Sequence, residues 1–256
     1  MPFEKVLPDK LSTIVVKQIE LLILRGILRP GERLPAEREL SERLGVSRPS
    51  LREAIAELQD RGLLTAKAGS GIFVADVLGS AFSPALIQLF ATHDDAVFDY
   101  LSFRKDMEGM AARRAATYGS DSDLKVVQAV FDKMEEAHGK RNADEEARLD
   151  AQFHSAIIDA SHNVIMLHMM RSMFDLLREG VFYNRKVMFQ QRTSRPALLD
   201  QHRRINEALQ ARDADAAEAA VRDHLDYVES CLVQQQKSDR NETTAQQRLK
   251  RELGER

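Results

Sequence analysis

Between residues 95 and 236 the sequence has helical periodicity almost without interruption, and this pattern constrains the fold more than any other feature. Apolar residues recur every three or four positions, as they do on one face of an α-helix. Amphipathic helices bury their apolar stripes against one another, so this part of the chain is predicted to be an antiparallel helical bundle. Its six helices are expected at residues 95–118, 121–141, 143–161, 164–190, 194–211 and 214–236.

The first 75 residues predict a winged helix-turn-helix, which makes the whole chain mainly α with one small β-hairpin. Gly45 supplies a permissive turn residue, and Ser47 is the expected N-cap of the helix that follows it. Gly62 ends that helix, and a glycine-rich hairpin comes directly after it. Helices are expected at residues 11–27, 36–44 and 48–61, and strands at residues 63–66 and 72–74.

The second helix of such a motif reads DNA, because its first turns enter the major groove. Its start carries hydrogen-bonding and basic side chains, and Arg38 on the preceding helix can join them. The first 75 residues have a net charge of about +2 and the remainder about −5, which permits a DNA-binding head on an acidic body. The other interpretation is that these are ordinary solvated side chains. The candidate DNA-binding residues of the helix are Ser47, Arg48, Ser50 and Arg52.

The segment LRPGERLPAERELSERLGVSRPSLREAIAELQDRGLL closely resembles the N-terminal domain of the GntR family of bacterial regulators. The resemblance extends over about residues 8–75. It implies a winged helix that binds a palindromic double-stranded operator as a homodimer. In the family's pattern Arg38, Arg48 and Arg52 match DNA-contacting arginines, and Gly69 lies in the wing that reaches the minor groove.

The predicted bundle carries polar residues on faces that should be apolar. Asp150 and His154 are four residues apart, so they project from one side of their helix, which also carries apolar residues. His202 and His224 lie on the apolar stripes of two further helices. One carboxylate and three imidazoles suit a divalent ion such as Zn, Ni or Mn and leave coordination positions open for a ligand. The alternative is a set of independently satisfied core histidines.

The segments DAQFHSAI, DQHRRINEAL and VRDHL resemble the helical effector domain of the FadR-type branch of GntR regulators. Metal-binding members of that branch carry an aspartate and three histidines in this order, which match Asp150, His154, His202 and His224. Within the branch, the chain looks most like the group of the L-lactate-responsive and pyruvate dehydrogenase complex repressors. The acyl-CoA-binding member lacks the metal tetrad.

Three further residues are candidates for gripping an effector. Arg104 and Glu108 lie on the same side of their predicted helix as apolar residues, where an unpaired charge would be unfavourable. They form either a simple i, i+4 salt bridge or part of a site in which the arginine holds a carboxylate. Asn163 is a weaker candidate, in the segment SHN before the fourth helix of the bundle.

These observations predict a metabolite-responsive transcription regulator rather than an enzyme. We expect a repressor that is released when a small 2-hydroxy or 2-oxo acid, such as lactate, pyruvate or glycolate, binds at the metal. The alternatives are a metal-dependent hydrolase with a DNA-binding head and Glu108 as its base, an acyl-CoA-responsive regulator, and an architectural DNA-binding protein. No phosphate-binding loop or nucleophile accompanies the cluster, which argues against the hydrolase.

The expected organisation has two domains joined by a linker and followed by a disordered tail. The chain has no apolar run that could cross a bilayer, and its single cysteine, Cys231, agrees with a reducing compartment, so we expect a cytoplasmic protein. The boundaries are a DNA-binding domain at residues 1–77, a linker at 78–94, a metal- and effector-binding domain at 95–236 and a tail at 237–256.

Overall fold

The computed structural model describes residues 10–76, 83–93, 95–178 and 194–253. It divides into two compact units, Met1–Ala81 and Phe82–Arg256. The division lies inside the segment predicted as a linker. Among the described helices, none is both long and apolar enough to cross a membrane.

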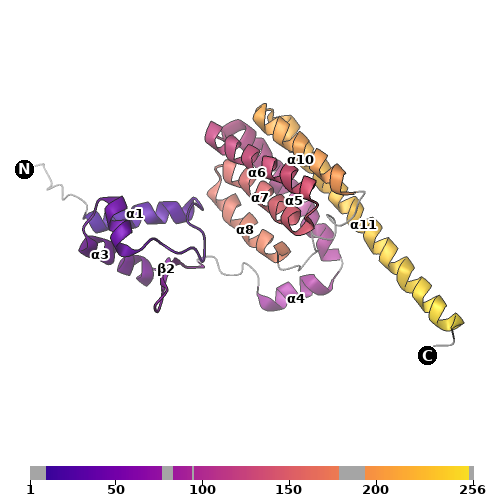
Figure 1. Ribbon diagram of the computed structural model, residues 1–256, viewed down its shortest axis with the longest axis horizontal. Helices are drawn as coiled ribbons and strands as arrows, with labels where there is room; N and C mark the ends of the chain where they lie inside the picture. The colour runs from indigo at the N-terminus through magenta and orange to yellow at the C-terminus, as the bar shows by residue number, and fades with distance from the viewer. Residues whose placement is uncertain (1–9, 77–82, 94, 179–193, 254–256) are drawn as a thin grey trace, which may run out of the picture. The chain divides into compact units, whose positions relative to one another are not determined.

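Within its described residues, 10–76, the N-terminal unit has three helices and a two-stranded antiparallel sheet, as predicted (Figure 1). The strands pair from Leu64 opposite Val74 to Lys67 opposite Gly71, and a bridge from Arg33 to Phe73 extends the sheet. Apolar residues of all five elements and of the adjoining segments pack into one core. The elements are α1 (Leu11–Leu24), α2 (Glu37–Leu44), α3 (Arg48–Asp60), β1 (Leu64–Lys67) and β2 (Gly71–Val74).

The turn between α2 and α3 is built as its residues predict. Gly45 caps α2 in the left-handed conformation, with φ 65°, which suits a residue without a Cβ. Ser47 is the N-cap of α3, and its Oγ accepts a hydrogen bond from the Ser50 backbone N–H at 3.3 Å. Leu51 and Leu58 face inward from α3 and are fully buried. This packing leaves the opposite face of α3 exposed to solvent.

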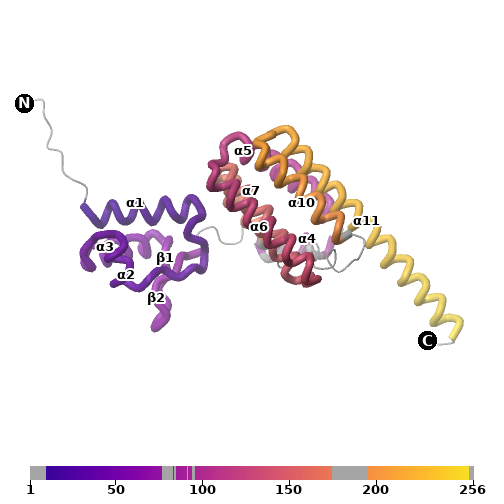
Figure 2. The backbone as a smooth tube through the Cα atoms, turned by 45° about the horizontal axis from the view of Figure 1, so that its top comes forward, coloured from indigo at the N-terminus to yellow at the C-terminus, as the bar shows by residue number. Residues whose placement is uncertain are grey.

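The C-terminal unit is a helical bundle (Figures 1 and 2). The six described helices that match predicted ones start at the predicted positions. The last part of the predicted helix 164–190, beyond residue 178, lies outside the described residues. The helices are α4 (Pro84–Thr92), α5 (Asp95–Tyr118), α6 (Asp121–Lys140), α7 (Ala143–Ala160), α8 (Val164–Arg178), α10 (Ser194–Gln210) and α11 (Ala214–Glu252).

Four of these helices enclose the centre of the bundle. Helix α5 packs against α7 and α11, and α10 packs against α11 and α6. Their apolar faces, together with those of α6 and α8, form the main core, in which Phe153 and Ile205 are fully buried. Because α5, α7, α10 and α11 meet here, an inward-facing side chain on any of them reaches the same region.

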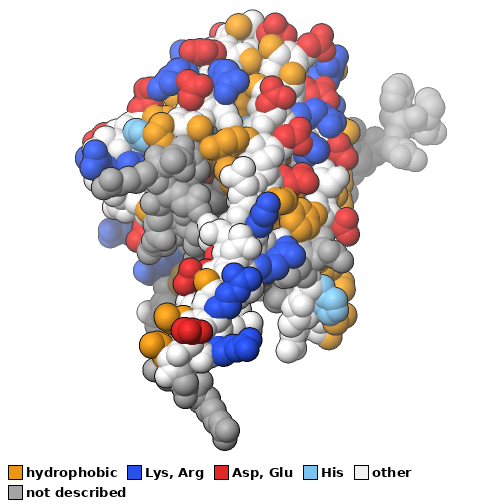
Figure 3. All heavy atoms as spheres, turned by 90° about the vertical axis from the view of Figure 1, so that its right-hand side faces the viewer, with side chains coloured by type: hydrophobic (Ala, Val, Ile, Leu, Met, Phe, Trp, Pro, Cys, Tyr) orange, Lys and Arg blue, Asp and Glu red, His pale blue; other side chains and the backbone are white. Residues whose placement is uncertain are grey.

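Two segments are more ordered than predicted. Helix α4 lies within the predicted linker, where Ser83 caps it and Pro84 occupies its first turn. Helix α11 continues to Glu252, so the prediction of a disordered tail at 237–256 is wrong for its described part. This segment contains no glycine or proline before Gly254, and polar pairs one turn apart, such as Gln235 with Asp239 at 2.8 Å, support the helix. Figure 3 shows the side of the molecule that lies at the right in Figure 1, and basic and acidic side chains are intermixed on it.

Candidate functional site

Polar residues are buried in the centre of the C-terminal unit. Asp150 and His154 come from α7, His202 from α10 and His224 from α11, and each is at most 6% exposed. One possible ligand atom from each lies within 4.8 Å of all the others. The structure therefore brings together the four residues singled out in the sequence.

The contacts inside this cluster are short. His202 Nε2 lies 3.1 Å from Asp150 Oδ1 and 3.4 Å from His154 Nε2. The rings of His202 and His224 have centroids 4.4 Å apart. Three imidazoles and one carboxylate crowded in this way supply the mixed nitrogen and oxygen donors that a borderline divalent ion prefers. The cluster can hold a metal ion.

The outer nitrogens of two histidines are held by residues of neighbouring helices. His154 Nδ1 lies 2.6 Å from Glu108 Oε2, and His224 Nδ1 lies 3.0 Å from Gln201 Oε1. An ionised carboxylate and an amide oxygen only accept hydrogen bonds, so both contacts favour the tautomer with the proton on Nδ1. The Nε2 lone pairs are then free to face a cation, which is the arrangement found in metal sites with a supporting outer shell. These contacts show that the residues fit a metal ion.

Arg104 and Glu108 form a buried ion pair beside the cluster. Arg104 Nε lies 2.5 Å from Glu108 Oε1, and both side chains are at most 3% exposed. Burial alone would raise the pKa of Glu108, but the neighbouring guanidinium of Arg104 and the contact with the His154 ring outweigh it and lower the pKa to about 2. Glu108 is therefore ionised, and it links the guanidinium to a candidate metal ligand. The predicted i, i+4 salt bridge is present, and it is part of this larger network.

Burial also determines the charge of the histidines. Desolvation lowers the pKa of His154 despite the opposing effect of Glu108. Desolvation, together with the neighbouring imidazoles, lowers the pKa of His224 well below its usual value. Both rings are therefore neutral at physiological pH, as metal ligands must be.

These pKa shifts predict that the metal-free protein loses stability in mild acid. Below about pH 6.5 the unfolded chain takes up protons on His154 and His224, whereas the folded chain does not. The free energy of unfolding therefore decreases as the pH falls through this range. Thermal melting of chelator-treated protein should show a lower Tm at about pH 5.5 than at about pH 7.5, and the dependence should weaken in His224→Gln. Equal slopes in the two proteins would contradict this assignment.

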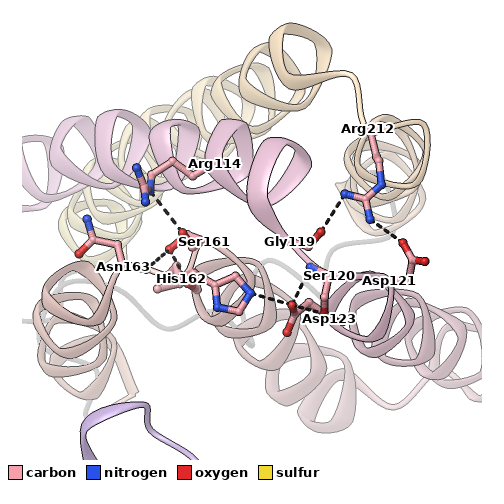
Figure 4. A network of polar contacts seen from close by, with 10 residues as sticks. Arg114, Gly119, Ser120, Asp121, Asp123, Ser161, His162, Asn163 and Arg212 are labelled. Carbon is pink, nitrogen blue, oxygen red and sulfur yellow. Dashed lines mark hydrogen bonds and ion pairs between the residues drawn. The ribbon is translucent and has the colours of Figure 1, made fainter.

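Asn163 lies in the turn between α7 and α8, where its side chain caps the start of α8. Its Oδ1 accepts hydrogen bonds from the backbone N–H groups of Ile165 and Met166, both at 3.1 Å. Figure 4 shows it in the polar network at this end of the bundle, beside Ser161. The contacts described for its side chain are those of an N-cap of α8. They do not join it to the metal cluster.

The candidate DNA-binding residues lie on α2, at the start of α3 and in the turn of the hairpin. Arg48 is exposed in the first turn, and Arg52 follows one turn later. The guanidinium of Arg52 is held by Glu37 of α2, with Nε 2.8 Å from Oε2. Arg38 is exposed on α2, Ser47 and Ser50 form the cap described above, and Gly69 lies in the turn of the hairpin with φ 71°.

Comparison with known families divides the chain between the same two units. The model of the gntR family of bacterial regulatory proteins matches residues 11–74, and the model of the FCD domain matches residues 99–227. The chain belongs to the GntR family. Its helical bundle is the FCD domain of this family, the FadR-type C-terminal domain.

Several curated GntR-family relatives cover most of the chain. The Glc operon transcriptional activator of Escherichia coli is 35% identical, covering 86% of this chain and 87% of its own. The "Putative L-lactate dehydrogenase operon regulatory protein" of Escherichia coli is 36% identical, with coverage of 89% and 88%. Bacillus subtilis LutR is 33% identical, with coverage of 82% and 96%. These relatives are transcription regulators and not enzymes, which sets the hydrolase alternative aside.

A solved structure agrees with the fold of this GntR-family chain. The GntR protein of Streptococcus agalactiae superposes with a TM-score of 0.50 and 24% identity, covering 85% of this chain and 98% of that one. The winged helix and helical bundle predicted from the sequence are thereby confirmed as the fold.

Sequence reasoning missed several supporting residues of the GntR-family site. It did not connect Glu108 with His154 or Gln201 with His224, because these pairs come from different helices and have no fixed spacing along the chain. Of these residues, only Glu108 could be recognised from the sequence, because it is an acidic residue on an otherwise apolar side of its helix. Glu146 was also missed, although it is 4% exposed and forms an ion pair with Arg195.

Proposed function

We propose that this chain is a homodimeric, metabolite-responsive transcription regulator whose effector binds at a metal in the FCD domain. The observation that carries the proposal is the buried cluster of Asp150, His154, His202 and His224, braced by an ionised Glu108. Apolar residues would be enough to pack a core. Burying four converging polar groups is unfavourable unless each has a hydrogen-bonding or metal partner. A divalent ion such as Zn, Ni or Mn would satisfy all four at once.

The DNA-binding part of the proposal places residues 1–77 on a palindromic operator. Arg38, Arg48 and Arg52 would contact bases or phosphates from α2 and α3, and Gly69 would let the wing approach the minor groove. Ser47 and Ser50 would fix the start of α3 and contact the backbone of the DNA. Each winged helix reads one half-site, so two copies are required, and sedimentation of the protein tests whether it is a dimer.

The effector part of the proposal concerns the chemistry of the site within residues 95–236. When bound, the ion would supply positive charge and coordination positions for a carboxylate and a neighbouring hydroxyl or keto oxygen. Arg104 would contribute a guanidinium that Glu108 has already oriented, next to the rings of Tyr100 and Phe174 at 5.8 and 5.5 Å. A small 2-hydroxy or 2-oxo acid combines these features. The names of the relatives linked to lactate and Glc operons agree with such a ligand.

The proposed response is weaker operator binding when the effector is bound. A ligand shifts DNA affinity only if it prefers one of two conformations, and the coupling must act equally in both directions. The site joins α7, α10 and α11, with α5 behind it, so an effector that draws these helices together acts on the bundle as a whole. One relative is named as an activator, so the sign of transcriptional control is a separate question from this coupling.

Calorimetry is expected to show that L-lactate binds the metal-loaded protein and that operator DNA weakens this binding. Propionate has the same carbon chain without the hydroxyl, so it should bind much more weakly because it cannot chelate. Chelator treatment should abolish the lactate signal, and Arg104→Gln should reduce lactate affinity while leaving the metal in place. Equal lactate affinity in free and operator-bound protein would refute the coupling. No heat with lactate, pyruvate or glycolate would refute the ligand class.

A further inference from the structure

A small cavity lies beside His202 on the inner face of the bundle. Its polar lining includes His138 of α6 and Glu146 of α7, and its volume is about 10 Å³. His202 is fully buried, and its Nε2 faces Asp150 and His154 in the metal cluster. Its other ring nitrogen, Nδ1, is buried without a hydrogen-bonding partner. The cavity is lined by Met134, His138, Glu146, Arg195, Leu199 and His202.

His202 differs in this respect from the other two histidines of the cluster. Glu108 holds His154 and Gln201 holds His224, each through Nδ1. A cation bound at Nε2 of His202 would require the proton to sit on Nδ1, where it needs an acceptor. Leaving a buried N–H donor unpaired is unfavourable. The chemistry of the cluster therefore calls for an acceptor on the cavity side of the ring.

The cavity has the size and polarity of a site for one water molecule. Its volume is at the lower limit that one water requires, and a buried water usually makes two to four hydrogen bonds. Three groups lining it can make them: His202 Nδ1, the Glu146 carboxylate and His138 Nδ1, which is also buried without a partner. Met134 and Leu199 supply its apolar lining, and Arg195 lines it as well.

Glu146 is held firmly in its place at this cavity. Both of its carboxylate oxygens lie 2.8 Å from Arg195 Nε, and the carboxylate is 4% exposed. His138 Nδ1 lies 3.8 Å from Glu146 Oε2, too far for a direct hydrogen bond but close enough for both to share a bridging water. The ion pair with Arg195 holds the Glu146 carboxylate at a fixed position, where it can accept a hydrogen bond from a water.

We propose that this cavity binds one ordered water that joins His202 Nδ1 to Glu146, which makes Glu146 a positioning residue for the metal site. The water accepts the N–H of His202 and donates to Glu146, while His138 takes its second hydrogen. Glu146 thereby orients the ring of His202 through one water, as Glu108 orients the ring of His154 by direct contact. The effect on metal affinity rests on the proposed function. The water site itself does not, because without a cation His202 Nε2 can donate to Asp150 Oδ1 at 3.1 Å, and the water then donates to Nδ1 instead of accepting from it.

The first test is a crystal structure of the metal-free protein at a resolution that shows ordered waters. A fully occupied water within hydrogen-bonding distance of both His202 Nδ1 and Glu146 is expected. Density without such a water would overturn the inference, whether or not the protein binds metal. If wild-type protein takes up no zinc, the proposed function fails and this crystallographic test still decides the water site.

The second test compares two variants of neighbouring glutamates. Glu146→Gln should lower zinc affinity about 10- to 100-fold in chelator competition, the range seen when outer-shell partners are replaced. Glu145→Gln makes the same chemical change at a half-buried position of α7 that does not line the cavity, and should leave zinc affinity unchanged. In the zinc-loaded protein the His202 Nδ1–H proton should exchange faster with solvent in Glu146→Gln.

A purely structural role for Glu146 would give a different result. Breaking its ion pair with Arg195 would lower thermal stability, but zinc affinity and the exchange rate of the His202 proton would not change. That outcome would overturn the assignment of Glu146 as a positioning residue. Arg195→Gln breaks the same ion pair and keeps the carboxylate, so it should retain more zinc affinity than Glu146→Gln. Equal losses in the two variants would also contradict the proposal.

Discussion

Metal analysis of His202→Ala is expected to find no bound zinc under conditions that load the wild-type protein with one ion per chain. His202 lies at the centre of the cluster, with contacts to Asp150 at 3.1 Å and to His154 at 3.4 Å. Removing it leaves at most three ligands and takes away the ring that joins α10 to α7. Outer-shell replacements alone weaken metal binding about 10- to 100-fold, and losing a direct ligand should exceed this.

Two further variants separate loss of the site from loss of the fold. His202→Gln keeps most of the volume of the ring, so it should fold with a near-native Tm and still bind zinc poorly. His162→Ala removes a histidine that is exposed and paired with Asp123, outside the cluster, and should load normally. Full zinc occupancy in His202→Ala, or equally empty wild-type protein after attempted loading, would dispose of the metal site.

Operator binding should weaken by about 1–3 kcal/mol when Arg48 is replaced by alanine, which corresponds to about a 5- to 150-fold rise in Kd. Arg48 is exposed in the first turn of α3, where a guanidinium can reach base edges in the major groove. A contact to guanine would relax specificity at one base pair. If Arg48 instead contacts a phosphate, its loss would weaken binding to all sequences alike. The slope of log affinity against log salt concentration would then decrease by about one.

The matched control for this experiment removes the same charge from the other unit. Arg240 is exposed on the distal part of α11, and Arg240→Ala should leave operator affinity unchanged. Arg52→Ala is also expected to weaken binding, although Arg52 must exchange its exposed ion pair with Glu37 for a DNA contact. Exposed pairs of this kind contribute little, so the exchange is not a large barrier. Gel-shift titrations with unchanged affinity for both Arg48→Ala and Arg52→Ala would refute the DNA-binding assignment.

The sequence was sufficient to predict the helices and the tetrad because both depend on local spacing. The 3.6-residue period places Asp150 and His154 on one face of α7, and the same period places His202 and His224 on apolar stripes. Apolar stripes face the centre of a bundle, so polar side chains that lie on the stripes of three helices are brought close to one another there. The turn of the winged helix was predictable for a similar reason, since Gly45 and Ser47 act within a few residues of their own positions.

The supporting contacts of the site could not be predicted, because they depend on the rotation of one helix against another. Glu108 meets His154 across two helices, and Arg195 meets Glu146 over 49 positions of sequence. The ordered end of α11 was missed for a different reason. Its polar composition predicts disorder, but residues that suit a helix can extend one that a bundle already nucleates.

The unbroken course of α11 has a mechanical consequence. The helix runs from His224 in the candidate metal cluster to Glu252 without a proline or glycine, and it packs on the bundle core as far as Leu232. With a rise of about 1.5 Å per residue, the arm beyond Leu232 is about 30 Å long. A rotation of about 5° where the arm leaves the core would carry its tip through about 3 Å. A small rotation of α11 at the cluster would thus become a displacement as large as a side chain at the far end of the helix.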